Sequence, residues 1–140
     1  MRRSLGPDWL VADMPAVAGE YFEHGTVQSL LHCVFIARDA DTGAPLGFAE
    51  VSLRDYAEGC LSTPVGYLEG WYVEPAARGR GVGSALVRAG EEWARAQGCC
   101  EFASDADVDN AASIRAHESL GFEPVAEVRC FRKRLDAPAD

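Results

Sequence analysis

The sequence has no hydrophobic run long enough to cross a membrane and few basic residues for its size. A spanning helix needs ~20 consecutive apolar residues, and no segment of the chain approaches that length. The 140 residues include 13 Lys and Arg against 22 Asp and Glu, which gives a formal net charge of −9. Nucleic acids and anionic lipid surfaces are bound by clustered basic residues. The composition therefore argues against nucleic-acid and membrane partners and is compatible with a cationic one.

Cysteine is present, but not in a pattern that builds a disulfide framework or a metal site. The cysteines form an odd set without a Cys-x-x-Cys pair, at positions 33, 60, 99, 100 and 130. We therefore expect neither a disulfide framework nor a zinc site. Cys33, Cys99 and Cys130 lie in apolar, strand-like runs, where small buried thiols are the ordinary expectation. Because no apolar run of signal-peptide length follows the opening residues either, we expect a cytoplasmic protein.

Hydrophobic periodicity predicts a single α+β domain over residues 1–140, without linkers or internal repeats. Helices are expected over 7–24, 81–97 and 110–120. Strands are expected over 30–38, 46–54, 65–73 and 101–104, and within 122–135. Pro15 is unfavourable inside the first helix, whereas Gly98 and Gly121 follow the other two helices, where glycine commonly ends a helix. The order of these elements indicates a mixed sheet flanked by helices. The helix over 81–97 has one apolar face, formed by Val82, Leu86, Ala89 and Trp93.

The most informative segment is a glycine-rich turn between the strand over 65–73 and the helix over 81–97. Its glycines at 79, 81 and 83 permit a tight turn and a close approach of the backbone to a ligand. The turn amides lie at a helix N-terminus, where unpaired N–H groups and the helix dipole favour an anion, and Arg78 and Arg80 add positive charge. The turn lacks the Gly-Lys-Ser/Thr of a P-loop and the third glycine of the dinucleotide fingerprint. It therefore predicts a diphosphate site of another kind, the alternative being a glycine-rich turn without a ligand.

The spacing Arg78-x-x-Gly81-x-Gly83 after a strand and a proline resembles the acetyl-CoA signature of the GNAT-type N-acetyltransferases. A second block resembles a later helix-to-strand segment of the same family, and it consists of Asn110, Ser113, His117 and Leu120-Gly121-Phe122. The stretch from 47 to 135 is similar to one subgroup, the aminoglycoside 6′-N-acetyltransferases. The segments that carry this similarity are 47–50, 52–54, 59–60, 67–70, 103–105, 117–122 and 131–134.

This resemblance implies a GNAT-like, mostly antiparallel sheet, acetyl-CoA as co-substrate, and acetyl transfer to the 6′-amine of an aminoglycoside antibiotic, which confers resistance. The family normally opens with a strand and a complete first helix. Here residues 3–8 resemble the end of that helix, so we expect a short N-terminus and no opening strand. The exposed sheet edge that would result predicts a homodimer, with residues 128–134 as a possible contributor.

The resemblance also implies which residues hold the coenzyme. Backbone amides of the turn would bind the diphosphate, and the strand segment Trp71-Tyr72-Val73 would run beside the thioester and the pantetheine arm. An amide near Val73 would bind the thioester oxygen as charge develops on it. The full set of expected coenzyme contacts is Trp71, Tyr72, Val73, Arg78, Gly79, Arg80, Gly81, Val82, Gly83, Ser84, Asn110 and Ser113.

Acetyl transfer to an amine requires a group that accepts the proton of the ammonium ion and an acid that protonates the departing thiolate. Glu69 is the first candidate for the proton acceptor, the alternative being a surface carboxylate on a strand face. Asp105 lies just past the end of a strand, where open sheets bind ligands, and the resemblance places it near the aminoglycoside. Together with Tyr67, these two carboxylates are the expected substrate contacts.

His117 stands where many GNAT enzymes have the tyrosine that protonates the thiolate. An imidazole titrates near neutrality and is suited to this task, although a histidine that caps or packs the helix end is an equal alternative. Cys99 lies near the presumed centre of the site, but no base pattern accompanies it. We therefore prefer direct attack of the amine in a ternary complex to a covalent acetyl-cysteine.

Two other interpretations stay open. The first keeps the reaction and changes the acceptor to a polyamine, an amino sugar or a protein N-terminus. The second is a non-catalytic acyl-CoA-binding domain, which a short N-terminus would suit. The acidic composition fits a polycationic acceptor, and the presence of Glu69, Asp105 and His117 argues against a domain that has lost its chemistry.

Overall fold

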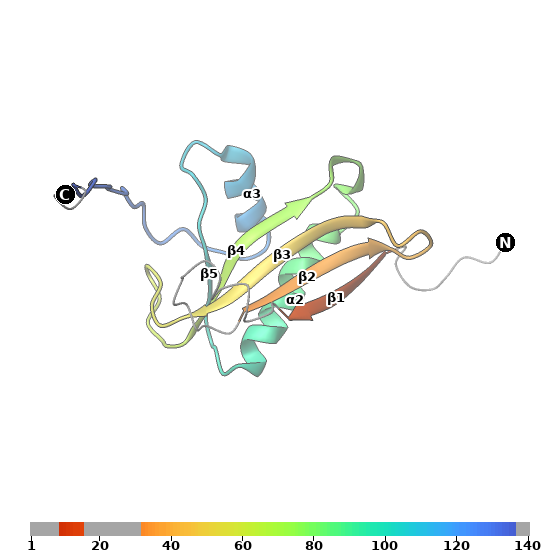
Figure 1. The fold of residues 1–140 in the computed structure, drawn as a ribbon, viewed down its shortest axis with the longest axis horizontal. Coiled ribbons are helices and arrows are strands. Elements are labelled where there is room, and N and C mark those ends of the chain that lie inside the picture. The colour runs from red at the N-terminus through yellow and green to blue at the C-terminus, as the bar shows by residue number, and fades with distance from the viewer. Residues whose placement is uncertain (1–8, 16–31, 137–140) are drawn as a thin grey trace.

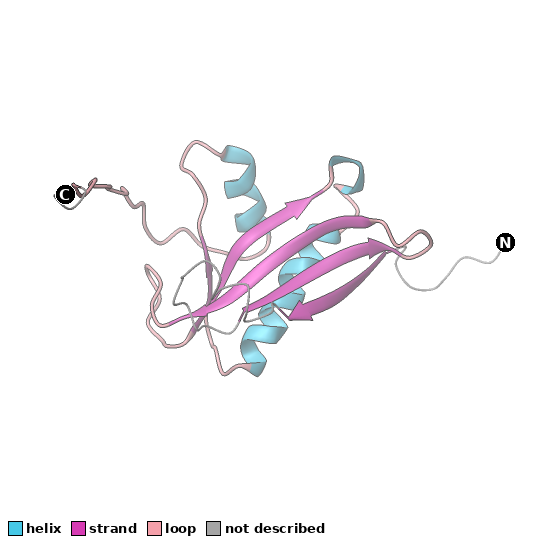
Figure 2. Cartoon of the chain, in the orientation of Figure 1, coloured by secondary structure: helices cyan, strands magenta, loops and turns pink. Residues whose placement is uncertain are grey.

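The computed structural model describes residues 9–15 and 32–136, which form one sheet with helices beside it (Figure 1). The strands follow the order β1-β2-β3-β4-β5 across the sheet. They are β1 (Trp9–Pro15), β2 (His32–Asp39), β3 (Pro45–Arg54), β4 (Val65–Val73) and β5 (Phe102–Ser104). Neighbouring strands are antiparallel except for β4 and β5, which are parallel. A short 3-10 helix η1 (Pro75–Ala77), the helix α2 (Val82–Ala96) and the helix α3 (Ala111–Ser119) complete the elements (Figure 2). The predicted mixed, mostly antiparallel α+β architecture is confirmed.

Helix α2 packs against one face of the sheet and supplies much of the core (Figure 1). Leu86 is fully buried on this helix, as the predicted apolar face requires, and Val51 of β3 is fully buried opposite it. Gly90 allows the close contact, since a Cβ atom there would lie 2.9 Å from a methyl group of Val51. Neither of the described helices is long and apolar enough to cross a membrane.

The helix predicted over 7–24 is wrong where the structure describes it, because residues 9–15 form strand β1. Trp9 and Val11 are partly buried and pack on the core, whereas Leu10 and Ala12 are exposed, which is the alternation of a strand. The edge of β2 offers backbone groups along seven residue pairs, from Trp9 with Asp39 to Pro15 with Cys33. Pairing with that edge overrides the local pattern, and it also corrects the expectation that the opening strand is missing. The rest of the predicted helix, residues 16–24, lies outside the described residues.

The strand predicted within 122–135 is also wrong, since residues 122–136 form neither helix nor strand. Phe122 still packs on the core, but the rest of the segment extends away from the sheet (Figure 1), and its large apolar side chains are exposed, with Phe131 at 89% and Leu135 at 81%. A strand forms only where it pairs with the edge of another strand, and residues 122–136 do not pair with the free edge of β5. For the same reason Cys130 is exposed, contrary to expectation, whereas Cys33 and Cys99 are buried as expected.

Strand β4 carries an irregularity on its β3 side and borders an opening on its β5 side. It pairs with β3 along its length, but Glu50 lies opposite Gly70 and Val51 opposite Leu68, so that Glu69 is an extra residue in the ladder. Such a bulge re-aims a side chain. On its other side β4 pairs with β5 only from Gly66 to Leu68. Beyond Leu68 the two strands part, and the second half of β4 has no neighbour on that side among the described strands.

Candidate active site

The predicted catalytic residues gather where β4 and β5 part. A cavity of about 90 Å³ lies at this point. Its walls are formed by Leu68, Glu69, Gly70, Trp71, Ser104, Asp105, Ser113 and His117. A wider hollow of about 750 Å³ shares Ser104, Asp105 and His117 with it and extends to residues 58–60 and 122–127. The fold therefore brings Glu69, Asp105 and His117 to one place although they come from different elements.

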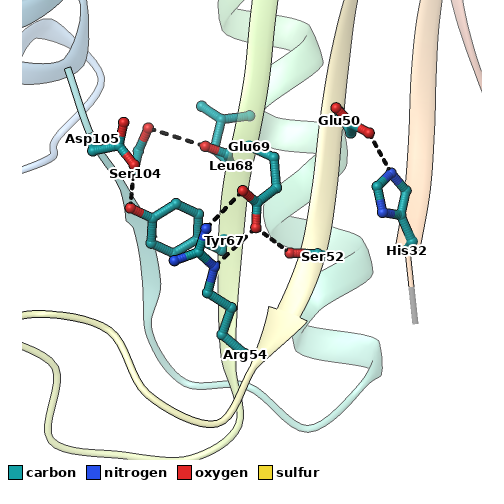
Figure 3. Close-up of polar contacts among 9 residues, drawn as sticks. All are labelled: His32, Glu50, Ser52, Arg54, Tyr67, Leu68, Glu69, Ser104 and Asp105. Atoms are coloured by element: carbon teal, nitrogen blue, oxygen red, sulfur yellow. Dashed lines mark hydrogen bonds and ion pairs between the residues drawn. The ribbon is translucent and has the colours of Figure 1, made fainter. Parts of the chain in front are cut away.

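Both carboxylate oxygens of Glu69 are already engaged. Ser52 donates its hydroxyl to Oε2 at 2.5 Å. Arg54 approaches as a fork, with Nε 2.9 Å from Oε2 and Nη2 2.8 Å from Oε1 (Figure 3). Partial burial acts to raise the pKa of Glu69, but the hydrogen bonds from Arg54 and Ser52 outweigh it and leave that pKa below its usual value. Glu69 is therefore an anion at neutral pH, with a cation bound to it.

Arg54 also connects Glu69 to the second carboxylate. Its guanidinium lies 3.5 Å from the centre of the Tyr67 ring, in the geometry of a cation–π contact. Tyr67 in turn donates its hydroxyl to Asp105 (Figure 3). Burial and this hydrogen bond raise the pKa of Tyr67 far above its usual value, so the phenol stays a neutral donor. Glu69 and Asp105 are thus linked through one cation and one aromatic ring.

His117 meets the cavity from α3. Its Nδ1 lies 2.7 Å from the carbonyl oxygen of Ser113, which can only accept, so Nδ1 carries a proton. Its Nε2 lies 2.8 Å from the hydroxyl of Ser104 and, in the neutral ring, accepts from it. The ring also packs edge-on against Trp71 and Phe122 at 5.4 and 5.1 Å. The ring is therefore packed at the helix, as one alternative for His117 expects, and it also has a polar contact toward the cavity; its role as an acid stays a prediction.

The glycine-rich turn forms an open helix start, as predicted. Gly81 precedes α2 with a φ of +83°, which favours glycine, and no side chain caps the helix. Ala85 is the first amide of the helix with a backbone partner, the carbonyl of Gly81 at 3.1 Å. The amides of residues 82–84 have no acceptor within the described part of the chain. A Cβ atom on Gly79 would meet nothing within 4 Å, so the turn has both the donors and the room for a diphosphate.

Trp71 connects this turn to the cavity. Its Nε1 donates to the carbonyl of Gly83 at 3.2 Å, while its ring packs against His117. Arg78 lies beside the same strand, with Nε bonded to the carbonyl of Val73 at 2.9 Å and its guanidinium 5.8 Å from the Tyr72 ring. The expected coenzyme contacts of β4 therefore lie between the turn and the carboxylates.

Some expected site residues have other partners. Asn110 caps α3 by accepting a hydrogen bond from the amide of Ser113 at 3.1 Å, so that its side chain is engaged in the helix cap. Ser113 lines the cavity and holds His117 through its carbonyl. Cys99 is buried, and burial raises the pKa of its thiol. The thiol is therefore a poor nucleophile. In addition, Cys99 does not line the cavity.

Sequence reasoning missed three residues of this site, namely Ser52, Arg54 and Ser104. The pattern offered one signal for them, since Ser52 and Arg54 fall within segment 52–54 and Ser104 within 103–105, both of which resemble the acetyltransferase subgroup. Nothing in the spacing along the chain indicates that Arg54 binds Glu69, because the two meet only across the β3–β4 pair.

A comparison with protein families assigns the chain to a family. The family described as the acetyltransferase (GNAT) family matches residues 1–122. The chain belongs to the GNAT acetyltransferase family. The GNAT chain uses acetyl-CoA as its co-substrate, and its open helix start fits the diphosphate of that molecule.

Relatives and solved structures narrow the comparison within the GNAT family. The chain is 48% identical over 135 residues to aminoglycoside N(6′)-acetyltransferase type 1 of Klebsiella aerogenes, which covers 96% of the chain and 87% of the relative. It is 50% identical over 107 residues to the enzyme of the same name from Stenotrophomonas maltophilia, covering 76% and 69%. The structure of aminoglycoside N-acetyltransferase AAC(6′)-Iy in complex with CoA superposes with a TM-score of 0.77 at 31% identity, covering 93% of this chain and 97% of that one.

A second structure of AAC(6′)-Iy contains the bisubstrate analogue CoA-S-monomethyl-acetylneamine. It superposes with a TM-score of 0.74 at 30% identity, covering 90% of this chain and 99% of that one. The resemblance to the aminoglycoside 6′-N-acetyltransferase subgroup is thereby confirmed, and with it the expected fold and the expectation of an acetyl-CoA-dependent enzyme.

Proposed function

We propose that this protein transfers the acetyl group of acetyl-CoA to the 6′-amine of an aminoglycoside. The observation that carries the proposal is the meeting of Glu69, Asp105 and His117 at the opening between β4 and β5. Two carboxylates suit a polycationic acceptor. The relatives, which are named aminoglycoside N(6′)-acetyltransferases and come from several bacteria, support the choice of acceptor.

The coenzyme lies, in this proposal, along the second half of β4 and ends at the turn. The amides of residues 79–84 bind its diphosphate, with the charges of Arg78 and Arg80 beside it, whereas the amide of Arg78 already donates to the carbonyl of Pro75 at 3.3 Å. Trp71, Tyr72 and Val73 flank the pantetheine arm, and an amide near Val73 binds the thioester oxygen. Support comes from the register, since the amides on the β5 side of residues 70–73 have no strand partner among the described residues.

The chain's own residues then handle the protons. Glu69 accepts the proton of the bound ammonium ion, directly or through water, while Asp105 and Tyr67 hold the acceptor. The neutral amine nitrogen bonds to the carbonyl carbon and loses its second proton to water, the carbon–sulfur bond breaks, and the sulfur receives a proton. Protonated His117 supplies it by donating from Nε2 to the hydroxyl of Ser104 as that hydroxyl gives up its own proton. The 2.8 Å contact between these two atoms supports such a relay.

An assay of CoA thiol release tests this function. Kanamycin and tobramycin are offered as acceptors in parallel with spermidine, and mass spectrometry of the product locates the acetyl group. We expect release with the aminoglycosides and acetylation at the 6′-amine. Release with spermidine alone would assign the enzyme to another amine. Binding of acetyl-CoA without release from any amine would favour a non-catalytic domain.

We also propose that the protein forms a homodimer through residues 128–134, which attach to β5 of a second copy. Val128 is 61% exposed and Phe131 89% exposed, whereas β5 ends the sheet with a free edge among the described strands. The segment is basic within an acidic chain, and its cations are Arg129, Arg132, Lys133 and Arg134. The hollow beside β5 is acidic, and its acids include Glu58, Glu101, Asp105 and Glu118.

Light scattering on the full chain tests whether the protein has the mass of a dimer in solution. We expect a dimer for the wild type and a shift to monomer in Phe131→Asp. An exposed charge reversal at Glu92→Lys on α2 serves as the control and leaves the dimer intact. A monomeric wild type at all concentrations would refute the proposal. The cytoplasmic location expected from the sequence stays a prediction.

A further inference from the structure

The anionic centre of the site already contains a cation that belongs to the chain itself. The guanidinium of Arg54 holds both oxygens of Glu69 at 2.8 and 2.9 Å. An acceptor ammonium ion bound at Glu69 needs the same oxygens, and a second positive charge beside Arg54 would be repelled. Arg54 and the acceptor ammonium ion therefore compete for the same two oxygens of Glu69.

We propose that Arg54 is an internal competitor of the acceptor, occupying the ammonium position at Glu69 until an amine displaces it. This inference rests on the proposed function, because it takes Glu69 as the residue that meets the acceptor amine. It assigns to Arg54 a specificity-determining role. An acceptor reaches Glu69 only if its further contacts, for example at Asp105, offset the loss of the Arg54 pair.

The geometry makes Arg54 displaceable. The Arg54 and Glu69 side chains are 40% and 27% exposed, so water screens the pair and can take up the released cation. Ser52 keeps its hydrogen bond to Oε2 when Arg54 leaves, so Glu69 stays oriented. The released guanidinium can therefore be hydrated by solvent.

A purely structural role for Arg54 predicts the opposite effect on the acceptor. If Arg54 only held Glu69 in place, its removal would disorder the carboxylate and weaken acceptor binding. If Arg54 competes, its removal leaves Glu69 anionic and accessible, and acceptor binding tightens. The sign of the change in KM for the amine distinguishes the two roles.

Arg54→Gln removes the charge and keeps a polar side chain. We expect the KM for an aminoglycoside to fall about two- to fivefold, the upper part of the range for a partly exposed ion pair, with the KM for acetyl-CoA unchanged. Arg95→Gln is the matched control, because Arg95 is an exposed arginine on α2 that lies 3.5 Å from Glu92, and it should change neither constant. A raised or unchanged KM for the amine in Arg54→Gln would overturn the proposal.

A double-mutant cycle shows whether the effect acts through Glu69. In the Glu69→Gln background the anion for which both cations compete is gone, so Arg54→Gln should no longer tighten acceptor binding. Equal tightening in both backgrounds would contradict competition at Glu69. Arg54→Lys keeps a positive charge but cannot form the fork, and we expect it to lie between wild type and Arg54→Gln. A tighter acceptor complex in Arg54→Lys than in Arg54→Gln would also contradict it.

Calorimetry of aminoglycoside binding without acetyl-CoA separates this inference from the proposed function. If the wild type binds the aminoglycoside without acetylating it and Arg54→Gln binds it more tightly, the competition stands and the proposed function fails. If the wild type acetylates the aminoglycoside and Arg54→Gln binds it no more tightly, the function stands and the competition is refuted. Circular dichroism of Arg54→Gln and Arg54→Lys checks that each variant is folded, so that a change in affinity is attributed to the site.

Discussion

A single methyl group in the glycine-rich turn gives the sharpest test of the coenzyme site. Gly81 has a φ of +83°, a conformation that costs an L-residue about 1 to 2 kcal/mol. A Cβ atom there would have the ring of Trp9 as its nearest neighbour, at 3.9 Å, which is an ordinary contact. Gly81→Ala therefore acts through the backbone rather than through a clash.

Gly43→Ala provides a control with the same backbone strain. Gly43 has a φ of +75°, and a Cβ atom there would meet nothing within 4 Å. It lies in the turn between β2 and β3, far along the chain from the start of α2. We expect either variant to lower the free energy of unfolding by about 1 to 2 kcal/mol, and Tm by roughly 3 to 10 °C for a chain of this size.

Only Gly81→Ala should also weaken acetyl-CoA binding. Relaxation of the strained residue moves the amides that begin α2, and one hydrogen bond to a charged phosphate is worth about 1.5 to 3 kcal/mol. Loss of one such bond raises Kd by about ten- to a hundredfold. Calorimetry at a temperature where both variants are folded measures this difference. Equal acetyl-CoA affinity in Gly81→Ala and Gly43→Ala would refute the assignment of the turn as the diphosphate site.

Four further outcomes follow from the site and the core. His117→Gln should reduce kcat by about a hundredfold or more, and full turnover at every pH would exclude the histidine as an acid. Cys99→Ala should retain most activity, because the thiol is buried and its pKa is raised; loss of all turnover would instead support a covalent acetyl-enzyme. Glu69 has a lowered pKa, so its contribution to stability is present above the unfolded value near 4.5 and is lost as the pH falls through the folded value. Urea titrations should therefore show the wild type converging on Glu69→Gln in acid, and a constant difference between them would contradict the ion pair. Leu86→Ala should cost about 3 kcal/mol because Leu86 is fully buried, whereas Leu61→Ala, at a side chain 98% exposed, should cost almost nothing; similar denaturation midpoints for the two variants would contradict the assigned core.

The local elements were readable from the sequence because short-range physics determines them. The strand predicted over 65–73 coincides with β4, and the helix over 81–97 contains α2 within a residue at each end. A glycine in a strained conformation marks the start of that helix, and its apolar period matches the face that packs on the sheet. The turn and its donors were predictable for the same reason, since the relevant groups are neighbours along the chain.

The elements at both ends of the sheet depended on pairing, and the sequence pattern predicted them wrongly. Residues 9–15 contain a periodicity compatible with a helix, yet the free edge of β2 makes them a strand. Residues 122–135 have strand-like composition, but they pair with no strand of the described chain, so they form no strand. Strand formation requires partners distant in sequence, which a local pattern does not contain.

The same division applies to the site. The sequence by itself determined that the chain carries a helix-start turn for an anion, two acidic candidates and a histidine, because these are matters of residue type and short spacing. Only the tertiary structure decided that Arg54 binds Glu69, which lies fifteen residues later in the sequence. The same holds for the contact between His117 and Ser104 at the cavity. Those contacts arise from the β3–β4 register, the bulge at Glu69 and the approach of α3 to β5, all of which depend on long-range pairing and packing.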